Sequence, residues 1–158
     1  MSTSITPPFL EGQTGLRSGI EQFLINAHEL PELSIDERID VIEGAVGFLA
    51  EMLLPHARAH ERIVCPELDR RLGRHGSAAY VARDRALIQE RIEELSDADP
   101  RDVGRIQEIL YALHALLTIH LEHEAELYLK LVQTQPDEPV RRLFRRVTEH
   151  SPDLTPAA

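Results

Sequence analysis

The sequence predicts an all-α protein, an up-down-up-down four-helix bundle with a short extra helix at its C-terminus. Apolar residues recur at alternating steps of three and four along four long segments, as they do on one face of an amphipathic helix. The chain is 42% hydrophobic but only 4% aromatic and has no Trp, so its core must be aliphatic, which favours packed helices over a sheet. A length of 158 residues suits one domain.

Three parts are expected along the chain. Residues 1–12 and the last residues of the chain are rich in Ser, Thr and Pro and show no apolar period, so both ends are predicted to be disordered tails. Residues 13–133 form the predicted bundle. Residues 134–158 hold the short helix and the C-terminal tail.

The first helix is predicted at Gln13–Leu30, where Pro31 helps to end it. The second helix opens at Ser34, which forms a capping box with Glu37. Pro55 should kink this helix without ending it, because the apolar pattern continues beyond it towards Gly73.

Ser77 is predicted to be the N-cap of the third helix, Ala78–Leu95. Asp99, followed by a proline, is a start signal for the fourth helix, Pro100–Val132. A short basic helix, Pro139–His150, is expected on the outside of the bundle.

Polar side chains interrupt the apolar face of each predicted helix. In an up-down-up-down bundle the late parts of helices two and four meet the early parts of helices one and three. These polar side chains are therefore expected at the same end of the bundle, where they form one polar layer. Leaving them buried and unpaired would cost on the order of 2 to 7 kcal/mol for each neutral group. The polar residues of this layer are Gln13, His56, His60, Arg85, His120 and Glu124.

A metal ion is the natural partner for such a layer. His56 and His60 lie one helical turn apart, as do His120 and Glu124, so each pair can reach one ion from one helix face. Imidazole and carboxylate together suit iron, zinc or manganese. A hydrogen-bonded polar core without metal is the alternative.

Two segments carry a family resemblance. Leu-Pro-His-Ala-Arg-Ala-His-Glu at 54–61 and His-Leu-Glu-His-Glu at 120–124 resemble the ligand segments of the hemerythrin-like, HHE cation-binding family, and the likeness spans Gln13 to Val132. The resemblance implies a bundle with a non-heme di-iron centre. Its implied ligand order is His, His-x-x-x-Glu, His, His-x-x-x-Glu. Its implied roles are oxygen binding, iron or oxygen sensing, and the handling of peroxide or nitric oxide.

His56, His120 and Glu124 agree with the family pattern. His60 stands where the first motif expects Glu, and its neighbour Glu61 is the candidate for an extra carboxylate ligand. With this ligand set, one ion or none replaces the expected pair of irons.

Gln13 and Arg85 stand near the positions where helices one and three should supply His. A guanidinium cannot coordinate a metal. Arg85 therefore suggests a rival reading in which it replaces the metal and pairs with Glu124 or Glu61. In a simpler reading, Arg85 extends out of the bundle end to solvent.

Composition narrows the function classes. The net charge of −10, with basic residues scattered among acidic ones, disfavours nucleic acid as a partner. Cys65 is the only cysteine, and neither an export signal nor an apolar run long enough for a membrane is present, so a cytoplasmic protein is expected. Motifs for phosphate loops and nucleophilic catalysis are also missing.

The sequence therefore predicts a metal-binding hemerythrin-like protein, with iron as the metal and O₂ or another small oxidant as its ligand. Sensing, binding or detoxification fits these residues better than a dedicated enzyme. The alternative is a metal-free bundle, its polar core satisfied by Arg85, that acts as a protein-interaction module. Whether two copies form a homodimer stays open.

Overall fold

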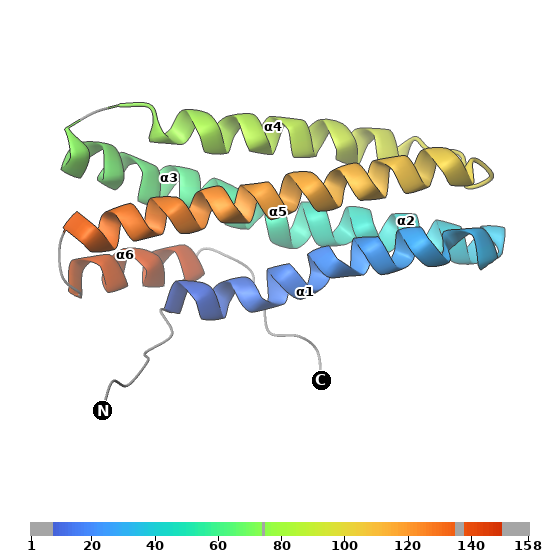
Figure 1. Ribbon diagram of the computed structural model, residues 1–158, viewed down its shortest axis with the longest axis horizontal. Coiled ribbons are helices and arrows are strands. Elements are labelled where there is room, and N and C mark those ends of the chain that lie inside the picture. Colours follow the sequence, from blue (N-terminus) through green and yellow to red (C-terminus); the bar gives the residue numbers. More distant parts are fainter. Residues whose placement is uncertain (1–7, 74, 135–137, 150–158) are drawn as a thin grey trace.

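The computed structural model describes residues 8–73, 75–134 and 138–149 (Figure 1). Within these ranges the chain forms helices and turns and no strand, which confirms the predicted all-α class. None of the helices in the described ranges is long and apolar enough to cross a membrane. Residues 1–7 and 150–158, which include most of the two predicted tails, lie outside the described residues.

Helix α1 spans Pro8–Glu29 and is followed by the 3₁₀ turn η1, Leu30–Glu32. The helix begins five residues before the predicted Gln13, so residues 8–12 are helical and are not part of a tail. Proline suits the first position of a helix, because its missing N–H has no partner there in any case.

Helix α2 spans Ile35–Phe48 and begins with the predicted capping box. The Ser34 hydroxyl accepts a hydrogen bond from the Glu37 N–H at 3.3 Å, and the Glu37 carboxylate accepts one from the Ser34 N–H at 2.7 Å. Such caps stabilise a helix by about 1 kcal/mol.

A π-helical turn, η2 (Leu49–Leu53), joins α2 to α3 (Leu54–Leu72). The helix thus runs on past Pro55 as predicted, but the Leu54 N–H bonds to the Leu49 carbonyl, one residue farther back than in an α-helix. Helix α3 ends at Gly73, whose φ of 62° is the left-handed conformation that glycine adopts without strain.

Helix α4 spans Ser77–Ser96, and the predicted N-cap Ser77 is its first residue instead. Asp69 of α3 takes over the capping role. Its two carboxylate oxygens accept hydrogen bonds from the N–H groups of Gly76 and Ser77, each at 3.1 Å. The end of α3 therefore fixes the start of α4.

Helix α5 spans Val103–Thr134, so the predicted start at Pro100 is three residues too early. Asp99 forms a tight turn instead, with its carboxylate accepting from the Arg101 N–H at 2.9 Å. Asp102 then caps α5 by accepting from the Arg105 N–H at 3.0 Å.

Helix α6 spans Glu138–Glu149, within one residue of the prediction at each end. It packs against α3 and α1, beside the first turns of α1 in Figure 1. Leu143 and Val147 are 8% and 3% exposed, so α6 buries an apolar edge against the other helices.

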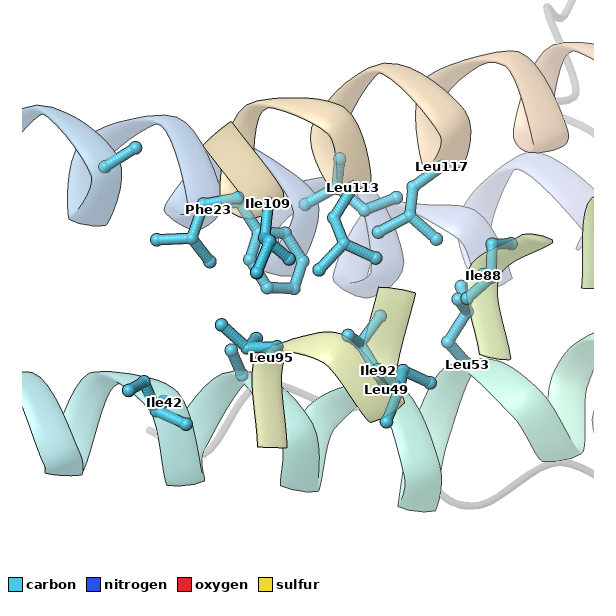
Figure 2. Packing of buried hydrophobic residues seen from close by; sticks show 14 of the residues in the cluster. Phe23, Ile42, Leu49, Leu53, Ile88, Ile92, Leu95, Ile109, Leu113 and Leu117 are labelled. Atoms are coloured by element: carbon cyan, nitrogen blue, oxygen red, sulfur yellow. The ribbon is translucent and has the colours of Figure 1, made fainter. Parts of the chain in front are cut away.

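The main core lies between α1, α2 with η2, α4 and α5. Figure 2 shows its side chains pointing toward one another from these helices. The four predicted apolar rows supply most of it, which explains why the core is aliphatic. Its buried members are Leu16, Ile20, Phe23, Ala27, Leu30, Ile42, Ala45, Leu49, Leu53, Leu54, Ile88, Ile92, Leu95, Ile106, Ile109, Leu110, Leu113, Leu117 and Leu121.

A second, small core lies towards the other end of α3 and α5. Its buried members are Ala59, Val64, Leu68, Leu143 and Val147. Along α3 the main core ends at Leu54, and along α5 it ends at Leu121. The buried polar residues close to these two positions therefore lie between two apolar cores and not at one end of the bundle as the sequence suggested, because α6 adds apolar side chains beyond them.

Gly19 of α1 packs closely against the ring of Phe48. A Cβ at Gly19 would collide with the edge of the Phe48 ring, which is also held in an edge-to-face contact with Phe23 at 5.9 Å. Gly19→Ala should therefore lower the free energy of unfolding by about 1 to 2 kcal/mol in a urea titration, despite its better helix propensity.

Gly44→Ala is the matched control, because a Cβ at Gly44 of α2 meets nothing within 4 Å. This variant should raise the free energy of unfolding by up to about 1 kcal/mol. Equal stabilisation by both substitutions would contradict the packing of Gly19 on Phe48.

Candidate functional site

Five polar side chains are buried where the two cores meet, and the sequence predicted all of them. Each is at most 4% exposed. They come from α1, α3 and α5. We call this group the polar layer; it consists of Gln13, His56, His60, His120 and Glu124.

The local sequence places these side chains on facing helices. His56 and His60 follow the π turn and lie one turn apart on α3, with their ring centroids 6.3 Å apart. His120 and Glu124 are one turn apart on α5. Residues at these spacings share one face of a helix, which explains how three helices deliver the layer.

Glu124 is the centre of the polar layer. Its Oε2 atom lies 3.0 Å from Nε2 of His56 and accepts a hydrogen bond from the Gln13 amide at 3.3 Å. Its Oε1 atom lies 3.0 Å from Nε2 of His120. One carboxylate thus contacts side chains from α1, α3 and its own helix.

The contact between His120 and Glu124 is close but is not a well-formed hydrogen bond. Among the described residues, neither Nε2 of His120 nor Oε1 of Glu124 has a hydrogen-bond partner, although the two atoms are only 3.0 Å apart. Buried polar atoms with poor geometry are costly. A group that satisfied both atoms would remove this cost.

Burial and nearby charges shift the pKa values of Glu124 and His120 in opposite directions. Burial alone would raise the pKa of Glu124, but the surrounding His56, His60 and His120 hold it well below its usual range. Burial likewise disfavours a charged His120, but Glu124 and Asp84 raise its pKa to about 9. Near neutral pH, a protonated His120 therefore balances the Glu124 carboxylate.

His60 behaves differently from His120. Burial lowers its pKa to about 4, and the attraction of Glu124 only partly offsets this effect. His60 is therefore neutral near pH 7, the state in which an imidazole can coordinate a metal.

Glu61 and Arg85 were both expected in the layer, but the structure pairs them with each other at its edge. Nε of Arg85 donates to Oε2 of Glu61 at 3.0 Å, and the two side chains are 26% and 25% exposed. The charge that balances Glu124 is therefore on His120 and not on the guanidinium. Of the two partners considered for Arg85, Glu61 is the one it contacts.

Asp84 is a site residue that the sequence analysis missed. Its Oδ2 atom lies 2.8 Å from Nδ1 of His123 and 3.5 Å from Nδ1 of His120. Burial would raise the pKa of Asp84, but these two histidines lower it below its usual range. Steps of three and four from Val81 allow either position 84 or position 85 to face the core, and that spacing was the available signal.

Cys65 lies on α3, five residues beyond His60, and is completely buried. Burial, together with the nearby Asp69, Glu124 and Glu61, raises the pKa of its thiol to about 12. A thiol that stays protonated is a poor nucleophile and metal ligand. Cys65 therefore serves as a small apolar side chain.

The donor atoms of the polar layer are imidazole nitrogens and carboxylate oxygens, which are common metal ligands. Both contacts of Glu124, at 3.0 Å from an imidazole nitrogen, are within ordinary hydrogen-bond distance. Within the described ranges, however, no group of three or more His, Cys, Asp or Glu side chains is arranged to hold an ion as it stands. Imidazole nitrogens and a carboxylate are donor types that iron, zinc and manganese accept, but their arrangement here does not surround an ion.

Comparison with models of known families, with curated proteins and with solved structures found no match to this chain. The hemerythrin-like resemblance therefore rests on the motif residues alone.

The shifted pKa values predict how stability depends on pH in chelator-treated protein. His120 keeps its proton in the folded state up to about pH 9, whereas its ordinary pKa is 6.5, so stability should fall by up to about 1.4 kcal/mol per pH unit between these values. His60 has a lowered pKa, so stability should also fall as the pH drops from 6.5 towards 4.

Urea titrations from pH 5 to 9.5 measure both effects, and the free energy of unfolding should be greatest near pH 6.5. His120→Gln should remove most of the alkaline decline, and His28→Gln, at an exposed position of α1, should leave it intact. An alkaline decline of the same size in His120→Gln would contradict the pKa assigned to His120.

Proposed function

We propose that this protein binds a single metal ion in the polar layer, with iron as the metal that the family resemblance favours. Its role would be the binding, sensing or detoxification of oxygen or another small oxidant. The observation that carries the proposal is the fully buried Glu124 carboxylate, with an imidazole nitrogen 3.0 Å from each of its oxygens.

The fold we propose is a hemerythrin-like, up-down-up-down four-helix bundle with α6 added. The continuous helix through α2, η2 and α3 would be its second member. Packing of α1 on α5, of α5 on α4 and of α4 on α3 supports this arrangement.

The residues that would hold the ion are His56, His60, His120 and Glu124. Three imidazoles and one carboxylate, buried together, are a donor set that iron accepts. A di-iron centre does not fit, because the polar layer contains a single carboxylate and Arg85 cannot replace a histidine ligand.

Bound iron would supply reversible interaction with oxygen or electron transfer to an oxidant. The chain controls the surroundings of the ion. The Gln13 amide donates to Oε2 of Glu124 and so holds the carboxylate in place. The apolar cores on either side keep bulk water away from the layer, which strengthens each electrostatic contact in it.

A second candidate is a metal-free bundle that serves as a protein-interaction module. The observation that favours it is the ion pair between a protonated His120 and Glu124, which balances charge without any metal. This version differs from the one drawn from the sequence, since His120 and not Arg85 provides the positive charge.

Metal content tests the two candidates. Protein expressed with iron supplied should carry about one iron per chain by plasma mass spectrometry. Glu124→Gln keeps the shape of the side chain but removes its charge, so it should lower the iron content at least tenfold. His28→Gln is the matched control and should leave the iron content unchanged.

Two irons per chain, with the near-ultraviolet absorption of an oxo bridge, would contradict the single-ion site. A folded, helical wild-type protein that takes up neither iron, zinc nor manganese would favour the metal-free candidate.

A further inference from the structure

We infer that Asp84 is a positioning residue that fixes the His120 ring, so that Nε2 of His120 faces Glu124. This inference rests on the proposed metal site. Asp84 lies on α4, which supplies no member of the polar layer, yet Asp84 reaches the layer through His120. Its side chain is only 15% exposed.

The two ring nitrogens of His120 have different neighbours. Nδ1 is 3.5 Å from Oδ2 of Asp84, a charge contact that is too long and poorly aligned to be a hydrogen bond, and Nε2 is 3.0 Å from Oε1 of Glu124. Glu124 is itself one of the proposed ligands, so an ion in the polar layer would lie beside Nε2, whereas the Asp84 carboxylate favours a proton on Nδ1 and limits rotation of the ring. The geometry therefore assigns Nε2 as the coordinating atom of His120.

His123 contacts Asp84 from the other side. Its Nδ1 atom is 2.8 Å from the same Oδ2 atom, and the His123 side chain is 37% exposed. His123 also lines a pocket of about 470 Å³ between α3, α4 and α5, along with Leu68, Tyr80 and Lys130. Asp84 is thus the contact between this outer pocket and the buried layer.

A purely structural role for Asp84 makes different predictions. In that case Asp84 only links α4 to α5 through His123, and the loss of either partner would have the same effect. A positioning role works through His120, so loss of Asp84 should affect the metal site far more than loss of His123.

The test uses the full chain with three substitutions: Asp84→Asn, which keeps the side-chain shape, His123→Gln, and Arg83→Gln as an exposed control on α4. Ferrous iron affinity is measured without oxygen by competition with a chelator. Asp84→Asn should weaken iron binding by about 10- to 100-fold. His123→Gln and Arg83→Gln should each change the iron affinity by less than about threefold, which is well below the effect expected for Asp84→Asn.

Nitrogen-15 NMR of the histidine side chains in metal-free protein is the second readout. The Nδ1 proton of His120 should be protected from exchange in wild type and His123→Gln, and should lose this protection in Asp84→Asn. If Asp84→Asn does not fold, the wild-type spectrum still tests the inference, because an Nδ1 atom of His120 that carries no proton would contradict it.

An unprotected Nδ1 proton in wild type would overturn the inference, as would equal weakening of iron binding in Asp84→Asn and His123→Gln. If wild type binds no metal, the proposed function fails, but the NMR measurement still decides whether Asp84 orients His120. The two failures are therefore distinguishable.

Discussion

The structure depends on keeping one carboxylate, that of Glu124, out of water. An isolated buried charge costs several kcal/mol, so a buried Glu124 requires partners from the neighbouring helices. Gln13 of α1 and His56 of α3 provide them, and His120, one turn away on the same helix as Glu124, adds a third contact. The apolar cores on both sides then stabilise an arrangement that the charged residue alone would disfavour.

Most of the fold was predictable because the spacing of apolar residues along the sequence indicates which side chains are buried. The expected apolar rows of the four long helices form the main core, and the capping box at Ser34 is present. The helix-capping pattern was less informative where two nearby residues could each cap the same helix. Asp99 and Asp102 can each cap a helix, and only the bond from the Arg105 N–H shows that Asp102 does so. The π turn before Pro55 had no sequence signal beyond the proline itself.

The buried part of the site was predictable for the same reason, since Gln13, His56, His60, His120 and Glu124 interrupt apolar rows. The choice between Asp84 and Arg85 was not, because steps of three and four both lead from Val81 into the core. In the folded protein, the charges of the neighbouring side chains determine which of the two residues contacts the histidines. Arg85 turns outward to Glu61, while the shorter Asp84 side chain reaches the histidines of α5.

Anomalous X-ray scattering at the iron edge, from crystals grown with ferrous iron, tests the metal site most directly. We expect a single peak in the polar layer, about 2.0 to 2.3 Å from Nε2 of His120 and from a carboxylate oxygen of Glu124. A layer without any peak, with Glu124 still in contact with His56 and His120, would contradict a metal-binding role and leave a charge-balanced polar core in its place.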